Sequence, residues 1–314
     1  MRTLITGGAG FLGSHISDRL LSRGDEVLAL DNLATGRRVN LSESDRLEFV
    51  KGTIADRDLV DACFDRFRPE VVVHAAAAFK DPDDWEEDLR SNALGTVHVV
   101  QAAKRHAVSR VVYLQTSLCY GRPLRSPIPI DHPLRPFTSY AISKTAGEQF
   151  VALSGVPYVS LRLANIYGPR HGSGPIPSFY RRLKEGQACY VTDTRRDFTY
   201  VDDFLDLMDR ILLEKPDATG CYNVCTGSDI SIRELLGLMA DRMGVDLPEP
   251  VDVIPPNSDD VATLLLDPGL TEETFGWKAR TSLTEGIDSM IEWFDKHGVA
   301  DAYTHLRIGD QGAG

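Results

Sequence analysis

The feature that most constrains the fold is a glycine-rich turn close to the start of the sequence. The apolar run Thr3-Leu4-Ile5-Thr6 predicts a short strand, and glycines follow at positions 7, 10 and 13. Glycine there permits a tight turn, lets the backbone approach a pyrophosphate, and lets the next helix pack closely on the strand. An ordinary glycine loop is the alternative. The strand before the turn and the helix start after it favour a dinucleotide-binding unit.

An acidic residue at the end of the next predicted strand indicates which dinucleotide is bound. The strand Glu26-Val27-Leu28-Ala29-Leu30 ends at Asp31, 18 residues after Gly13. A carboxylate at this distance suits the ribose hydroxyls of NAD and would repel the 2′-phosphate of NADP. The predicted cofactor is therefore NAD.

Tyr140 and Lys144 form a candidate catalytic pair. A spacing of four residues places the phenol and the ammonium on one face of a helix. The ammonium favours the phenolate, so the tyrosine pKa of about 10 can fall toward neutrality and the phenol can exchange a proton with a carbinol oxygen. Such a pair alone usually marks a solvated helix face. The glycine turn and Asp31 in the same chain favour the catalytic interpretation.

Composition excludes several classes of function. The formal net charge of −12 makes nucleic acid an improbable partner, because binding to a phosphate backbone needs a basic surface. No apolar run approaches the roughly 18 residues of a membrane span, and a strand is predicted from the first residues, so we expect neither a membrane span nor a signal peptide. The five cysteines show no metal-ligand spacing and predict buried thiols in a reduced, cytoplasmic protein.

Further motifs follow in a fixed order along the chain. They are Asp31-Asn32-Leu33, His74-Ala75-Ala76-Ala77, Asn92-x-x-Gly95-Thr96, Thr116-Ser117-x-x-Tyr120-Gly121, Tyr140-x-x-x-Lys144, the run from Arg162 to Arg170, and the run from Arg196 to Asp203. With this order and spacing, residues 2 to 295 resemble the extended short-chain dehydrogenase/reductase family, in its branch of NAD-dependent nucleotide-sugar epimerases and dehydratases.

The resemblance implies an α/β fold, a Rossmann-type doubly wound parallel sheet with a smaller C-terminal α/β lobe for the substrate. The expected NAD-binding domain is 1–170, with a return segment at about 196–228. The substrate lobe comprises 171–195 and 229–298, and 299–314 is expected to be a flexible tail. Related proteins form a homodimer through two helices, here 85–106 and 137–154. The apolar residues expected at that interface are Ala93, Val97, Val100, Phe150 and Val151.

The family also implies roles for single residues. Thr116, Tyr140 and Lys144 are the expected catalytic set, with Thr116 hydrogen-bonding the reacting hydroxyl and Lys144 holding the nicotinamide ribose. The expected substrate contacts are Lys80, Ser117, Asn165 and Arg196, the last through bidentate binding of a diphosphate. Besides Tyr140 and Lys144, the expected NAD contacts are Gly7, Gly10, Phe11, Leu12, Asp31, Asn32, Thr53, Ile54, Ala75, Ala76, Ala77, Asn92 and Tyr167.

His74 and Arg196 keep a structural alternative, and two other positions depart from the family. His74, in the motif that ends the fourth strand, fits a satisfied core histidine better than a functional one, and an arginine such as Arg196 taken alone is usually a surface charge. Thr53 replaces the aspartate that usually reaches the adenine amino group. Asn257 replaces a second arginine for the diphosphate.

The positions after Thr116 distinguish the activities of the branch. Dehydratases carry an Asp-Glu pair there and uronate decarboxylases keep the glutamate, whereas this chain has Ser117 and Leu118. Neither residue can act as a carboxyl acid or base. The sequence therefore predicts a nucleoside-diphosphate-sugar 4-epimerase acting on a UDP- or dTDP-linked hexose or uronate through a 4-keto intermediate. The alternatives are a decarboxylase or 4-keto reductase of the same branch, and a catalytically silent NAD-binding regulatory protein.

Overall fold

Seven parallel strands form the central sheet of the computed structural model, which describes residues 1–79, 81–247, 251–255 and 260–299. The predicted α/β, doubly wound fold is confirmed. The strand order is β3-β2-β1-β4-β5-β6-β11, with every neighbouring pair parallel. The strands are β1 (Arg2–Thr6), β2 (Glu26–Asp31), β3 (Leu47–Lys51), β4 (Val71–His74), β5 (Arg110–Thr116), β6 (Tyr158–Leu163) and β11 (Gly220–Val224).

The strand order reverses between β1 and β4, which pair with Thr6 opposite His74. In open α/β sheets a ligand lies outside the carboxyl ends of the strands at such a reversal, because the connecting loops diverge to opposite faces there. The glycine turn follows β1 and Ala75 follows β4. The topology therefore places both segments at the expected position for a dinucleotide.

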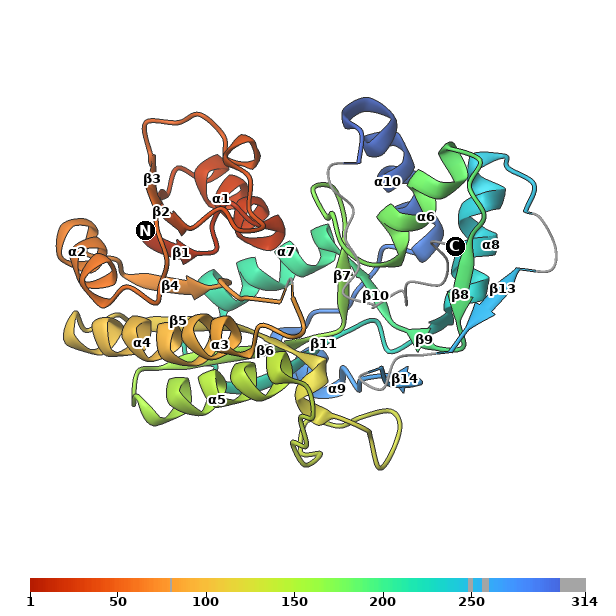
Figure 1. Cartoon of the computed structure of the whole chain (residues 1–314). Coiled ribbons are helices and arrows are strands. Elements are labelled where there is room, and N and C mark those ends of the chain that lie inside the picture. The colour runs from red at the N-terminus through yellow and green to blue at the C-terminus, as the bar shows by residue number, and fades with distance from the viewer. Residues whose placement is uncertain (80, 248–250, 256–259, 300–314) are drawn as a thin grey trace.

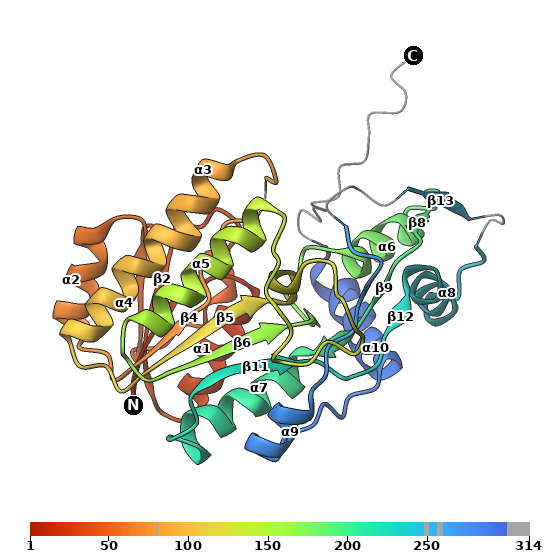
Figure 2. The same cartoon turned by 90° about the horizontal axis from the view of Figure 1, so that it is seen from below.

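Helices cover both faces of the sheet (Figures 1 and 2). Alternate residues of each strand face opposite sides, so Leu4 and Val72 pack in one core cluster while Ile5 and Val73 pack in another. One helical layer contains α2, α4 and α5, and the other contains α1 and α7. These helices are α1 (Phe11–Ser22), α2 (Arg57–Phe67), α4 (Thr96–Arg105), α5 (Ser139–Leu153) and α7 (Val201–Asp209).

The single long helix expected at 85–106 is divided into three parts. It comprises α3 (Trp85–Asp88), a π-helical segment η2 (Leu89–Gly95) and α4, which follow one another without a break. Short π segments within helices frequently occur at functional sites. This one carries Asn92.

The apolar residues expected at a dimer interface are mostly internal. Ala93, Val100 and Val151 are buried within the protomer, because they face the sheet or the neighbouring helix. Only Phe150 of that set is exposed to a substantial extent. Other apolar side chains on the same helical segments are exposed instead, namely Trp85, Leu89, Leu94, Ile142 and Leu153.

The C-terminal part adds three helices and several short strands at the end of the molecule away from β3 (Figures 1 and 2). The strands pair as β7 with β10, β8 with β13, and β12-β9-β14. The strands are β7 (Asn165–Tyr167), β8 (Tyr190–Thr192), β9 (Arg195–Arg196), β10 (Phe198–Tyr200), β12 (Ile230–Ser231), β13 (Asp252–Ile254) and β14 (Thr263–Leu264). The helices there are α6 (Pro175–Lys184), α8 (Ile232–Met243) and α10 (Leu283–His297), and α9 (Gly269–Phe275) contacts β11.

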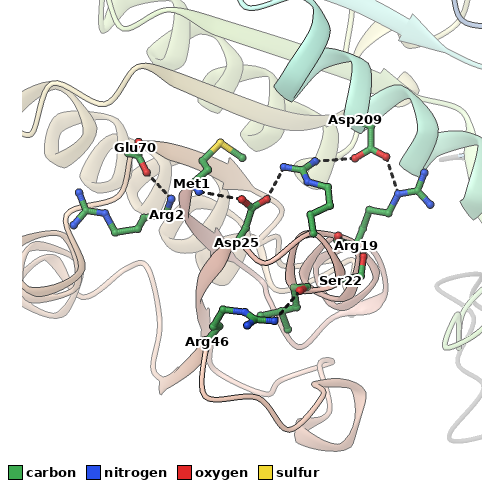
Figure 3. Close-up of polar contacts among 10 residues, drawn as sticks. Met1, Arg2, Arg19, Ser22, Asp25, Arg46, Glu70 and Asp209 are labelled. Atoms are coloured by element: carbon green, nitrogen blue, oxygen red, sulfur yellow. Dashed lines mark hydrogen bonds and ion pairs between the residues drawn. The ribbon is translucent and has the colours of Figure 1, made fainter.

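Ion pairs join the start of the chain and α1 to α7 (Figure 3). Asp209 accepts from Arg19 at 2.7 Å and from Arg23 at 2.9 Å. Asp25 pairs with the N-terminal amine at 3.0 Å and with Arg23 at 2.5 Å. These side chains are partly exposed, so each pair contributes at most about 1 kcal/mol. They orient α7 on α1, while the apolar contacts between the helices and the sheet supply most of the stabilisation.

All five cysteines are free thiols, and four of them are buried, as the sequence predicts. Within the described part of the chain, no group of three histidine, cysteine or acidic side chains could hold a metal ion. No helix among the described residues is long and apolar enough to cross a membrane.

Candidate active site

The glycine turn leaves no room for side chains where a dinucleotide would approach. Gly7 has a φ of +67°, and a Cβ added to it would lie 2.7 Å from the backbone nitrogen of Ala76. A Cβ on Gly13 would collide with the carbonyl oxygen of Gly7. The absence of side chains lets the start of α1 and the segment Ala75–Ala77 lie directly against the turn. This arrangement fits the pyrophosphate of NAD, which the N-terminus of α1 attracts.

Asp31 is already bonded to the backbone that surrounds the predicted ribose position. Its two carboxylate oxygens accept from the nitrogens of Ala9 at 2.9 Å and Leu33 at 2.7 Å. Burial raises the pKa of Asp31, and the backbone hydrogen bonds oppose that rise. A carboxylate has about four acceptor positions, so ribose hydroxyls still find free ones. The neighbouring predicted contact, Asn32, is exposed.

Thr53 and Ile54 follow β3, where the adenine of NAD is expected. The Thr53 hydroxyl accepts from the nitrogen of Ala55 at 3.2 Å, which forms a local turn before α2. The Ile54 side chain is buried, and a Cβ added to Gly95 would meet it at 2.6 Å. The second lone pair of the Thr53 oxygen is the acceptor that this edge offers to an adenine amino group.

Tyr140 and Lys144 both lie on α5, as the spacing predicts. Thr138 caps the helix by accepting from the nitrogen of Ala141 at 3.2 Å, so Tyr140 occupies the first turn. The positive end of the helix dipole favours an anion at that position. Lys144, one turn later, is buried, and its Nζ lies 4.1 Å from the centre of the Tyr113 ring.

The environment of Lys144 opposes its charge. Burial lowers the pKa of Lys144 to about 7, and the charge of Glu148 partly counteracts the burial. At neutral pH the side chain is therefore close to its own midpoint, and any neighbouring charge changes its protonation strongly.

Thr116 lies at the carboxyl end of β5, the strand against which α5 packs. Its Oγ accepts from the nitrogen of Leu118 at 3.2 Å and caps the short 3-10 helix η3 (Ser117–Tyr120). Two neighbours on β5 tie the strand to the helix, since Tyr113 Oη and Gln115 Nε2 both donate to the carbonyl oxygen of Lys144, at 2.9 and 3.1 Å. The structure thus brings Thr116 and the Tyr140–Lys144 helix to one place.

The Asn92 amide connects Ala78, in the loop after β4, to Ser143 on α5. It accepts from the Ala78 nitrogen at 2.8 Å, donates to the Ala78 carbonyl at 2.9 Å and donates to Ser143 Oγ at 3.0 Å. All three contacts fix backbone or side chains next to Tyr140. The Asn92 amide thus connects the segment after β4 to α5.

Arg196, the arginine expected to contact a sugar diphosphate, is already engaged. The guanidinium of Arg196 forms an ion pair with Asp260 and donates to the Val261 carbonyl at 2.8 Å. Burial lowers the pKa of Arg196, and Asp260 opposes that effect. Asn165 is exposed, and its amide donates to the Asp197 carbonyl at 3.0 Å. The predicted contact Lys80 and the variant position Asn257 lie outside the described residues.

Two predicted positions have side chains that turn into the protein core. Tyr167 is buried against the rings of Phe198 and Tyr200, and a Cβ on Gly286 of α10 would strike its hydroxyl. A contact with NAD at Tyr167 would have to come from the backbone. His74 is buried between Thr6 Oγ1 at 2.7 Å and Thr96 Oγ1 at 2.9 Å, and burial lowers its pKa to about 3. Of the two interpretations of His74, the satisfied core histidine is the one that these contacts favour.

Residues 3–225 match the model of the NAD dependent epimerase/dehydratase family. The chain belongs to this family. As a member it is an enzyme that uses NAD, which confirms the cofactor predicted from Asp31 and the glycine turn.

Similar proteins cover almost the whole chain. UDP-glucose 4-epimerase of Mycolicibacterium smegmatis is 37% identical, over 94% of this chain and 98% of its own. The crystal structure of WbmG from Bordetella bronchiseptica in complex with NAD and UDP is 50% identical, with a TM-score of 0.92 and 98% of each chain covered. The UDP-glucose 4-epimerase of Thermotoga maritima, solved with UDP-glucose, is 30% identical with a TM-score of 0.87, covering 94% of this chain and 99% of that one.

The sequence analysis missed two charged residues beside the catalytic pair. Glu148 follows Lys144 by one further helical turn, and Arg162 interrupts the apolar run of β6. A charged residue within a strand that is buried on both faces is a signal that Arg162 needs a buried partner, because such charges occur only when paired; the signal does not say which residue that partner is.

Proposed function

We propose that the protein is a nucleoside-diphosphate-sugar 4-epimerase that acts on a UDP-linked hexose or uronate with tightly bound NAD. The observation that carries the proposal is the joint position of Thr116 at the end of β5 and the Tyr140–Lys144 pair at the start of α5. The similarity to two UDP-glucose 4-epimerases along most of the chain supports UDP as the nucleotide.

Each of the three residues has a chemical task. Tyr140 takes the proton from the C4 hydroxyl of the sugar and later returns one to the same oxygen. Thr116 hydrogen-bonds that oxygen and holds it in line with the phenol. Lys144, when charged, favours the phenolate of Tyr140. NAD, when bound, supplies the acceptor and then the donor of the hydride at C4.

The residues after Thr116 support epimerisation over elimination or decarboxylation. Ser117 is buried, and Leu118 packs against the apolar cluster that contains Cys119 and Leu264. Neither side chain can transfer a proton as a carboxylic acid does, so water elimination lacks its acid and base. A 4-keto reductase or a uronate decarboxylase of the same family remains the second candidate, because loops around Phe79, Leu118 and residues 172–179 are expected to determine the sugar.

The proposed function assigns NAD to one lobe of the protein and the sugar nucleotide to the other. The NAD-binding lobe comprises 1–170 with a return segment at about 196–228, and β11 and α7 within that segment pack on the central sheet and on α1. The helices α6, α8 and α10 contact one another in the remaining part, which would carry the sugar.

A homodimer is proposed on a single apolar surface. Leu153 and Trp85 are 78% and 68% exposed, and Ile142 and Leu89 also lie exposed on the two packed helical segments α5 and α3–η2. Exposed apolar groups of this size on adjacent helices are typical of a protein interface. A second copy of the chain would pair these segments in a four-helix arrangement.

The test of the function is turnover without added cofactor. Purified protein is incubated with UDP-glucose, UDP-N-acetylglucosamine, UDP-glucuronate and the dTDP-hexoses, and the products are separated by chromatography. The expected result is a 4-epimeric mixture from one UDP-sugar, with no net NADH at 340 nm. Stoichiometric NADH or loss of carbon dioxide would favour the decarboxylase. Absence of any product across the panel, with NAD still bound, would favour a silent binding protein.

A further inference from the structure

Three charged side chains lie buried together behind the proposed catalytic tyrosine. Lys144 and Glu148 occupy successive turns of one face of α5, and Arg162 extends from β6. Their residues are 1%, 1% and 6% exposed. Burial of three charges is costly unless they compensate one another. The proposed chemistry uses only Lys144, so the other two need a separate explanation.

Glu148 is the only anion of the three and pairs directly with Arg162. Its Oε1 accepts from Arg162 Nη2 at 2.8 Å, and its Oε2 accepts from Arg162 Nε at 3.2 Å and from Ser160 Oγ at 2.6 Å. Arg162 therefore holds the carboxylate bidentately in one orientation. Lys144, four residues before Glu148, lies about 5–6 Å away between Cβ atoms by helix geometry.

The other titratable groups around this cluster are uncharged near neutral pH. Burial raises the pKa of the phenols and thiols that face it, and burial lowers the pKa of His74 to about 3, assisted by the charge of Lys144. Apart from Tyr140, the groups are Tyr113 on β5, His74 on β4, Cys119 and Tyr120 on η3, Tyr158 on β6 and Cys221 on β11. Of the two charged partners, Glu148 acts on the charge of Lys144, and Arg162 holds Glu148.

We propose that Glu148 is a positioning residue for the epimerase reaction: it keeps Lys144 charged, and Arg162 fixes the Glu148 carboxylate in place. The inference rests on the proposed function for its catalytic consequence, but not for the electrostatic interaction itself. Without a nearby anion, a fully buried ammonium would lose its proton and could no longer favour the Tyr140 phenolate. Glu148 supplies that anion from the turn of α5 that follows Lys144, whereas Tyr140 lies one turn before it.

Arg162 has a second connection that reaches the Thr116 side. Its Nη1 donates to Tyr120 Oη at 3.1 Å, and Tyr120 donates to Asn223 Oδ1 at 2.7 Å. Tyr120 ends η3, the short helix that Thr116 caps. The arginine that orients Glu148 therefore also anchors the turn bearing Thr116, so both halves of the catalytic set depend on one buried guanidinium.

The direct test measures the protonation of Lys144 without any sugar. The NAD-bound protein is labelled with ¹³C at lysine Cε, and the Lys144 signal is identified by its loss in Lys144→Met. We expect Glu148→Gln to lower the Lys144 pKa by on the order of one unit or more, because an opposite charge is lost nearby. Arg162→Gln should raise it, because Glu148 then has Lys144 as its main cation. Glu292→Gln, in an exposed pair with Lys296, is the control and should leave it unchanged.

A second variant, which removes both Glu148 and Arg162, keeps the test valid if Glu148→Gln alone fails to fold. Glu148→Gln leaves Arg162 buried without an anion, whereas Glu148→Gln combined with Arg162→Met replaces the whole pair by neutral groups, which buried sites tolerate better. If Glu148 acts on Lys144, the Lys144 pKa in the double variant is lower than in Arg162→Met alone. Equal Lys144 pKa values in the double variant and in Arg162→Met would show that Glu148 serves only to pair with Arg162, and would overturn the proposal.

The catalytic consequence appears in the pH profile. In Glu148→Gln the alkaline limb of kcat/KM, where Lys144 loses its proton, should move to lower pH, and the acid limb, where Tyr140 gains its proton, should move to higher pH. A one-unit shift reduces kcat/KM about tenfold on the alkaline side. Glu148→Asp, which keeps the negative charge, should restore part of the pH range over which kcat/KM is high. A uniform loss at every pH, with an unshifted Lys144 signal, contradicts the inference and leaves the epimerase proposal standing.

Discussion

The expected NAD side of the site is a backbone surface without side chains, whereas the expected diphosphate side is a guanidinium that is already paired. At Gly7 and Gly13 the shape is set by atoms that cannot rotate away, and Asp31 is held by two backbone nitrogens. At Arg196 the guanidinium is held by the Asp260 carboxylate and by the backbone carbonyls of Arg195 and Val261. A diphosphate bound there would have to share or displace that carboxylate, whereas NAD at the expected position would meet a surface that is already formed.

This difference suits an enzyme that retains one ligand and exchanges the other. A preformed backbone surface loses little conformational entropy on binding, which favours tight association. A site whose arginine is already paired gives up part of its binding energy to break the existing contact, which favours release. We therefore expect NAD to remain bound during purification while the sugar nucleotide exchanges in each cycle.

The largest effect is expected from Tyr140→Phe, which should slow the chemical step while leaving the binding of NAD and of the sugar nucleotide intact. Tyr140→Phe removes the phenol that carries the proton and keeps the ring, so turnover should fall about 10²- to 10⁴-fold. Bound NAD and the KM for the sugar nucleotide should change little. Kinetics on the active UDP-sugar, together with cofactor released by heat, provide the measurement. Near-normal turnover of this variant would place the catalytic base elsewhere.

The next largest effect is expected from a substitution that weakens NAD binding alone. Gly13→Ala places a methyl group against the Gly7 carbonyl, and overpacking of this kind costs roughly 1–3 kcal/mol. We expect the purified protein to contain several-fold less NAD than the wild type, measured by absorbance after denaturation. Gly237→Ala, in α8 with no atom within 4 Å of the added Cβ, is the matched control. Equal NAD content in the two variants would contradict a steric role of the turn.

A smaller effect tests the diphosphate side. Arg196→Gln removes charge-assisted hydrogen bonds worth about 1.5–3 kcal/mol, so the KM for the sugar nucleotide should rise about 10- to 100-fold while NAD stays bound. Arg195→Gln, the neighbouring arginine paired with Asp229, is the control and should leave KM near the wild-type value. If both variants behave alike, Arg196 is a structural partner of Asp260 rather than a ligand of the diphosphate.

The smallest effect on activity should come from a region outside both sides. Leu153→Glu places a charge on the exposed apolar surface of α5. We expect light scattering at micromolar concentration to change from a dimer to a monomer, with kcat altered less than about twofold because the site residues come from one chain. A wild-type protein that is already monomeric would remove the dimer proposal.

The sequence by itself determined the sheet, the cofactor unit and the position of the catalytic pair. These features follow from local rules: the alternation of strand residues, the steric freedom of glycine at a turn, and the helical repeat that places Tyr140 and Lys144 on one face. The order of motifs added the family. Apart from the order of motifs, each of these signals is contained in a few neighbouring residues, so it can be detected without knowing how distant segments pack.

Only the tertiary structure decided which side chains meet. It paired Arg196 with Asp260 and Glu148 with Arg162, turned Tyr167 toward α10, and buried Val151 beneath the surface proposed for the dimer. The partner of a buried charge depends on how distant segments pack, because desolvation makes each such charge seek whichever opposite group the fold brings near. That choice is a property of the packed core, and no local pattern in the sequence encodes it.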